Sequence, residues 1–181
     1  MTTAESLRIL GHALDQAGDV LDHVRADRLP LPTPCTDWDV AALADHLVEA
    51  PRRFLQMMRG QQPDWAAPPP HVEDGWGPRF REAGDDLIHA WHQRGEDVAP
   101  PPQMQIAEIA THTWDLATAL GRPISTLDPE VAETSLAFLQ QMLKPDLRGS
   151  AFAPEQVLPD GAGPYDRLAA FAGRTVVLGQ E

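Results

Sequence analysis

Apolar side chains recur every three or four residues along much of this chain, and prolines interrupt the pattern. This spacing places side chains on one face of an α-helix. The first such stripe predicts a helix of about five turns; its members are Leu7, Leu10, Leu14, Ala17, Leu21 and Val24. That helix cannot continue through residues 29–34, where three prolines lack the backbone N–H and restrict the residues before them. The 18 prolines of the chain therefore mark where helices begin and end.

Two further helices are predicted in the first half of the chain. We expect one helix with Thr36 as its N-cap, a kink at Pro51 and its end at Gly60; its buried stripe is Val40, Leu43, Leu47 and Ala50. Residues 61–77 are rich in Pro, Gly and Trp without periodicity, so we expect a long crossover there. The next helix opens at Pro78 and ends at Gly95; its inward face is Phe80, Ala83, Leu87, Ala90 and Trp91.

The second half predicts two more long helices and a tail. One helix runs from Gln103 to Leu120 and is closed by Gly121. Asp128 and Pro129 open the other, which reaches residue 143. A short helix is expected over residues 165–172 and a candidate strand over residues 175–178. We therefore predict an all-α protein, with a helical bundle over residues 1–143 and a mostly irregular tail over residues 144–181 that packs on the bundle and is not a separate domain.

Charge and cysteine content exclude several classes of protein. Lys and Arg total 14 against 27 Asp and Glu, a net charge of −13, which argues against a nucleic-acid partner and against a polybasic hold on membranes. No apolar run approaches the roughly 18 residues that span a bilayer, and the first residues carry no secretory pattern. We expect a cytoplasmic protein. A single cysteine excludes a disulfide framework and a Cys-rich zinc site.

Glu108 and His112 form the most informative polar pair. They are four residues apart on a predicted helix, so both side chains could hold one divalent ion such as Zn²⁺. His46 flanks the stripe of the second helix and is the best candidate for a third ligand. Asp115 and Glu49 each lie three residues beyond a candidate histidine and could orient it. Spacing alone favours a solvated Glu–His pair and a packed histidine.

The cysteine and the other histidines have simpler interpretations. Cys35 lies just before a predicted helix, where its thiol could be reactive, although a packed cysteine is the commoner case. His89 and His92 are three residues apart and could form a second site, but face water on the predicted helix. The remaining histidines are predicted on solvated helix faces or in the irregular stretch; these are His12, His23 and His71.

Three segments resemble a known family. Residues 33–48, TPCTDWDVAALADHLV, resemble the TPC-x-x-W-x-V-x-x-L-x-x-HL signature of the mycothiol-dependent maleylpyruvate isomerase N-terminal family, within the DinB-like metal-binding four-helix superfamily. Residues 108–117, EIATHTWDLA, are similar to its E-x-x-x-H-x-W-D-L-A motif, and residues 166–174 resemble the ending of its short members. The resemblance implies a DinB-like four-helix bundle with a long crossover after the second helix.

The resemblance also implies a site and a chemistry. His46, Glu108 and His112 match the residues that bind one divalent metal in the family, commonly zinc, with Ni, Mn or Fe as alternatives. The open metal position would activate a low-molecular-weight thiol such as mycothiol, which would attack an electrophile. Cys35 would then be a structural part of the signature. Members of the superfamily often form homodimers.

Isomerase activity itself is not implied. Family members with that chemistry carry a further C-terminal domain, whereas only residues 122–181 follow the fourth predicted helix. Arg52 and Arg53, just past Pro51, could bind a carboxylate, although exposed helix arginines are the simpler account. A thiol transferase-type enzyme is therefore the leading hypothesis. A non-catalytic metal-binding module and a helical interaction domain that binds no metal are the alternatives.

Overall fold

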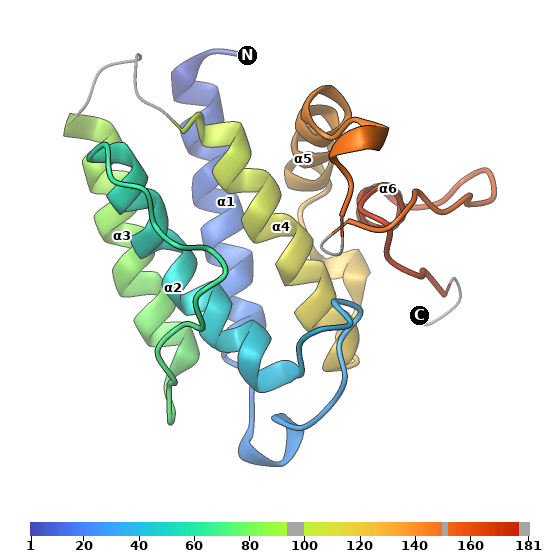
Figure 1. Ribbon diagram of the computed structural model, residues 1–181, viewed down its shortest axis with the longest axis horizontal. Helices are drawn as coiled ribbons and strands as arrows, with labels where there is room; N and C mark the ends of the chain where they lie inside the picture. Colours follow the sequence, from blue (N-terminus) through green and yellow to red (C-terminus); the bar gives the residue numbers. More distant parts are fainter. Residues whose placement is uncertain (94–99, 150–151, 178–181) are drawn as a thin grey trace.

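Helices form the regular structure of the residues that the computed structural model describes, 1–93, 100–149 and 152–177 (Figure 1). The α-helices are α1 (Thr3–Leu21), α2 (Val40–Met58), α3 (Trp76–Gln93), α4 (Pro102–Ala119), α5 (Pro129–Met142) and α6 (Pro164–Phe171). The predicted all-α class is confirmed and is consistent with a DinB-like bundle. Within the described ranges, β pairing is limited to one isolated bridge between Pro32 and Asp39, so residues 175–177 are not a strand.

Side-chain caps decide where the first two helices begin. Thr2 and Glu5 form a capping box that starts α1 at Thr3, because each side chain accepts a hydrogen bond from the other's backbone N–H. The prediction that Thr36 caps the second helix is wrong. Asp39 is the cap, accepting from the Ala42 N–H at 2.9 Å, because residues 34–38 are held in a separate turn. The hydroxyl of Thr33 stabilises that turn by donating to the carbonyls of residues 35 and 38.

The other helix boundaries follow their predicted signals closely. α2 continues through Pro51 to Met58. α3 begins two residues before Pro78, since a first-turn proline loses no intrahelical hydrogen bond; its predicted end at Gly95 lies outside the described residues. Gly121 follows α4 with φ +66°, a conformation that favours glycine. Asp128 caps α5 by accepting from the Glu130 N–H at 2.9 Å.

α4 lies at the centre of the helix packing. α1 and α2 each pack against both α3 and α4, while α5 packs on α4 and α6 packs on α5 (Figure 1). Ile106, Ile109 and Leu116 are fully buried on one side of α4, and Thr111, His112 and Asp115 are buried on another. A helix enclosed on several faces can hold polar side chains away from water. The division into a bundle over residues 1–143 and a tail over residues 144–181 that is not a separate domain stays a prediction.

A buried arginine fixes the connection between α2 and α3. The Arg53 side chain donates to the carbonyls of Trp65 at 3.2 Å and Ala67 at 2.8 Å, and its guanidinium lies over the Trp65 ring. The expectation that Arg53 is exposed is therefore wrong, because the connection covers it; Arg52 is exposed as expected. Further along, buried Asp45 accepts hydrogen bonds from the Val72 backbone and the Trp76 indole. These contacts hold Trp65 against α2.

Candidate metal centre

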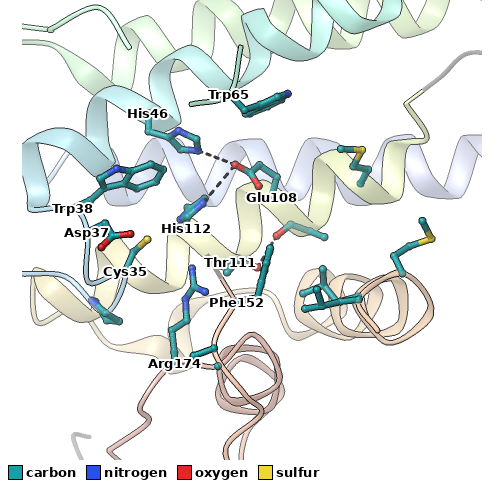
Figure 2. Close-up of a pocket in the computed structure, with 18 of the residues that line it drawn as sticks. Cys35, Asp37, Trp38, His46, Trp65, Glu108, Thr111, His112, Phe152 and Arg174 are labelled. Atoms are coloured by element: carbon teal, nitrogen blue, oxygen red, sulfur yellow. Dashed lines mark hydrogen bonds and ion pairs between the residues drawn. The ribbon is translucent and has the colours of Figure 1, made fainter. Parts of the chain in front are cut away.

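His46, Glu108 and His112 converge between α2 and α4 (Figure 2). The Nε2 atom of His46 lies 2.7 Å from Oε1 of Glu108, and Nε2 of His112 lies 3.5 Å from the same oxygen. One donor atom from each residue lies within 4.8 Å of the other two. The histidine side chains are 5% and 10% exposed and the carboxylate is 26% exposed, so the cluster is open on the Glu108 side.

Two of the three side chains in this cluster have the protonation state that a metal requires near pH 7. Burial acts to raise the pKa of Glu108, but the charge of His112 and the hydrogen bond with His46 outweigh it and lower the pKa to about 2. Burial lowers the pKa of His46, against the opposing effect of Glu108. Glu108 is therefore ionised and His46 neutral near pH 7, which are the protonation states that a metal requires of its ligands.

The donor set fits a divalent transition ion. Two imidazole nitrogens and a carboxylate oxygen are ligands of Zn²⁺, and sites that keep an open position use three protein ligands. Ligand atoms about 2.0–2.2 Å from one ion stand roughly 3–3.5 Å apart, close to the 2.7 and 3.5 Å found here. Two rigid helices supply the ligands, so little rearrangement is needed to close them on an ion.

Asp115 connects His112 to the C-terminal segment. Its Oδ2 lies 3.1 Å from Nδ1 of His112, and the carboxylate accepts from Nε and Nη2 of Arg174 at 3.2 and 3.0 Å. Burial acts to raise the pKa of Asp115, but the His112 hydrogen bond and the positive charges nearby lower it. The contact orients His112 with Nε2 toward Glu108.

The structure separates two residues that sequence spacing treated alike. Asp115 is in contact with a candidate ligand, whereas the Glu49 carboxylate lies 3.7 Å from Arg52 on its own helix and is not part of the cluster. Sequence reasoning missed Arg174 as a neighbour of the site. No local signal identifies it, because Arg174 lies 59 positions from Asp115 along the chain.

Two tryptophans flank the cluster. The Trp38 ring centroid is 4.4 Å from that of His46 and 5.4 Å from that of His112. The Trp65 ring lies 6.2 Å from His46 on another side. The indoles limit access of water to the imidazoles and leave the approach through the adjoining cavity.

A cavity of about 560 Å³ adjoins the cluster. Its charged lining residues are Asp37, Glu108 and Arg174; two histidines and two threonines also line it, and the rest of its wall is largely apolar. The volume falls within the roughly 300–1,000 Å³ of small-molecule sites. A ligand in this cavity would reach the open side of the His/Glu/His cluster.

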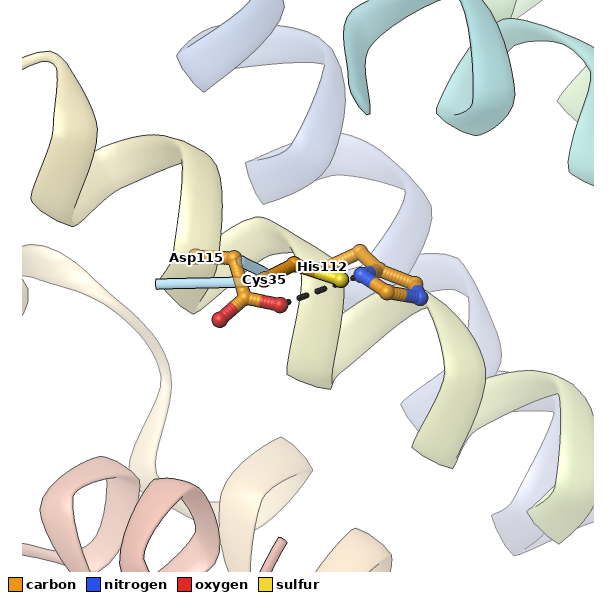
Figure 3. A group of neighbouring side chains, drawn as sticks. All are labelled: Cys35, His112 and Asp115. Atoms are coloured by element: carbon orange, nitrogen blue, oxygen red, sulfur yellow. Dashed lines mark hydrogen bonds and ion pairs between the residues drawn. The ribbon is translucent and has the colours of Figure 1, made fainter. Parts of the chain in front are cut away.

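Cys35 also lines the cavity, close to His112 and Asp115 (Figure 3). Burial and the nearby Asp115 charge raise the pKa of its thiol to about 11, so the thiol stays protonated near pH 7. This environment favours the interpretation of Cys35 as a packed cysteine over that of a reactive thiol.

The remaining histidines lie away from this centre. Nδ1 of His12 lies 2.6 Å from Oδ2 of Asp128 on the surface. Glu130 belongs to the same group of side chains and forms an ion pair with Arg8. His89 and His92 are exposed on α3. His71 contacts Asp45 from the irregular connection, with its ring 65% exposed.

The described residues form a helical bundle with a His/Glu/His cluster between two of its helices. The fold and the site therefore define a helical-bundle protein with a candidate metal centre. The chain belongs to a family described as mycothiol maleylpyruvate isomerase N-terminal domain, whose sequence model matches residues 10–102. This match includes His46 and ends at the start of α4, before Glu108 and His112.

Full-length similarity extends to two proteins of Mycobacterium tuberculosis. They are Uncharacterized protein MT0763 of strain CDC 1551 / Oshkosh and Uncharacterized protein Rv0738 of strain ATCC 25618 / H37Rv. Each is 34% identical to this chain, in an alignment that covers 91% of this chain and 94% of the relative. No solved structure matches the chain significantly. Among the described residues, no helix is long and apolar enough to cross a membrane.

Proposed function

We propose that this protein binds one divalent transition metal, with zinc the best-suited ion, and activates a low-molecular-weight thiol such as mycothiol for transfer to an electrophile. The observation that carries the proposal is the convergence of His46, Glu108 and His112 within 4.8 Å beside a cavity. The family's description names mycothiol. The protein's partners would be a small thiol and a small electrophile in the cytoplasm, with no nucleic acid or membrane, in keeping with the net charge of −13.

The residues of the chain would divide the work by position. When bound, the metal would lower the pKa of a coordinated thiol and hold it as a thiolate nucleophile. Asp115 keeps the His112 ring oriented with Nε2 toward the ligand site. Trp38 and Trp65 shield the imidazoles from water. The electrophile would therefore reach the metal through the cavity.

Metal binding is tested first, by elemental analysis of protein purified without a histidine tag. We expect about one equivalent of metal per chain, and loss of most of it in His112→Ala and Glu108→Ala. His89→Ala removes an exposed histidine far from the cluster and should retain the metal. A metal content near zero in the parent protein, unchanged in His112→Ala, would exclude the site.

Catalysis is tested next, by incubating zinc-loaded protein with mycothiol and 1-chloro-2,4-dinitrobenzene and following the coloured thioether. We expect a rate above that of Glu108→Ala at equal protein concentration. Metal binding without such acceleration would support the alternative of a non-catalytic metal-binding module. A homodimer also remains part of the proposal, and light scattering on the same preparation measures it.

A further inference from the structure

The cavity beside the candidate metal centre has two chemically different ends. The metal end is the part lined by the candidate ligands His46, Glu108 and His112. The opposite wall is apolar and comes from α4, α5 and the segment after α5; its members are Met104, Phe138, Leu139, Met142, Leu143 and Phe152. In Figure 2 Trp38 and Cys35 appear on one side of His112 and Phe152 on the other.

The apolar wall begins one helical turn from a candidate ligand. Met104 precedes Glu108 by four residues on α4, so both side chains face the same cavity. Phe138 and Met142 repeat this spacing on α5 and face α4 across the cavity. Two methionines make the wall adaptable in shape, because the unbranched thioether side chain fits irregular surfaces.

Among the described residues, the apolar wall of the cavity presents no cationic side chain to an anionic acceptor. The arginine that lines the cavity is Arg174, and Asp115 already binds its guanidinium at 3.0 and 3.2 Å. Asp37 and Glu108 also line the cavity and add negative charge to it. A carboxylate entering the apolar end would lose hydration without gaining a cationic partner.

We propose that the α5 side of the cavity binds an uncharged, apolar acceptor, and that the electrophilic carbon faces the metal end. This inference rests on the proposed thiol transfer. For a chloroaromatic acceptor, the thiolate sulfur forms a bond to the ring carbon, the carbon–chlorine bond breaks and chloride leaves. The thiol proton passes to solvent, and no oxidant or reductant takes part.

Binding of two inert rings tests the substrate class without any turnover. 1,3-Dinitrobenzene and 3,5-dinitrobenzoate share one ring and differ by a carboxylate, and quenching of tryptophan fluorescence in zinc-loaded protein reports their binding. We expect the uncharged ring to bind at least about tenfold more tightly. Equal or tighter binding of the carboxylate would overturn the inference.

Paired substitutions locate the binding. M104Q/M142Q keeps the length of both side chains but makes the wall polar, and should weaken binding of 1,3-dinitrobenzene about tenfold. M57Q changes a half-buried methionine of α2 that does not line the cavity, and should leave binding unchanged. Equal affinities in parent protein and M104Q/M142Q would overturn the assignment of this wall.

Turnover then separates the inference from the proposed function. Mycothiol is offered with 1-chloro-2,4-dinitrobenzene and with 4-chloro-3,5-dinitrobenzoate, and we expect the uncharged acceptor to have the higher kcat/KM. Equal kcat/KM values would overturn the acceptor class and leave thiol transfer standing. Selective ring binding with no turnover of either acceptor would overturn thiol transfer and leave the apolar subsite standing.

Discussion

The contact between Asp115 and Arg174 offers the sharpest test of how the C-terminal segment supports the site. The Asp115 and Arg174 side chains are 0% and 6% exposed, so solvent screens their attraction very little. Asp115→Asn removes the negative charge that the buried guanidinium contacts. Breaking a buried ion pair from one side costs about 3–5 kcal/mol. Because asparagine retains one acceptor oxygen, we expect a loss near the lower end, about 3 kcal/mol.

The same substitution should weaken metal binding. Asp115 contacts Nδ1 of His112 at 3.1 Å, and loss of such an orienting contact typically costs about 10–100-fold in metal affinity. The metal-free variant should unfold in urea with about 3 kcal/mol less stability, which corresponds to a fall in Tm of about 6–12 °C for a chain of this size. Competition with a zinc chelator measures the affinity.

Two variants control this experiment. Asp19→Asn also removes a partner of an arginine, Arg81, but from an exposed pair, and should cost less than about 1 kcal/mol. Asp115→Asn combined with Arg174→Met removes both charges and should recover part of the stability. Stability within about 0.5 kcal/mol of the parent, together with unchanged zinc affinity in Asp115→Asn, would refute the reasoning.

Three further predictions concern pH, the connection between α2 and α3, and the turn before the C-terminal segment. Burial lowers the pKa of His46 below its ordinary value of 6.5, so the metal-free protein should lose stability as the pH falls from 6.5 through the folded pKa. Urea titrations at several pH values measure this loss. The same dependence of unfolding free energy on pH in H46Q would contradict the prediction. Arg53→Met should lower the free energy of unfolding by about 2–3 kcal/mol because two carbonyls lose a charged donor. Arg52→Met, at the neighbouring position, should change it by less than about 0.5 kcal/mol. Equal effects would exclude a role for Arg53 in holding the connection between α2 and α3. Gly173→Ala should lower Tm, since φ is +83° and the added Cβ would meet a backbone oxygen at 2.2 Å, while Gly11→Ala in open helix surface should raise stability by about 0.5–1 kcal/mol; calorimetry that gives both the same sign would count against the described turn.

Helix positions were largely predictable because the signals are local. The apolar stripe of α2 was predicted from spacing alone, and Val40, Leu43, Leu47 and Ala50 are all fully buried. Asp128 and Pro129 likewise predicted the start of α5. Thr36 was the wrong cap because the hydroxyl of Thr33 holds residues 33–38 in a turn, so that the helix begins only after Asp39.

The candidate site was only partly predictable. Helical spacing placed Glu108 beside His112, and the position of His46 beside the apolar stripe of its helix made it the best candidate for a third ligand. The family resemblance implied the same three residues. Nothing in the sequence near Arg53 or Arg174 indicates that either is buried, since their partners lie 12–14 and 59 positions away. The apolar acceptor wall was also missed, because Met104 and Phe138 belong to different helices and become neighbours only when α5 packs on α4.

By itself, then, the sequence determined which segments are helical and which of their faces are apolar, because a helix is built from contacts three and four residues apart. Only the tertiary structure decided which faces meet. Packing of α2, α4 and the C-terminal segment brought His46, Glu108, His112, Asp115 and Arg174 into one cluster, and packing of α5 opened an apolar cavity beside it. Such contacts depend on the relative placement of whole helices, which no local spacing encodes.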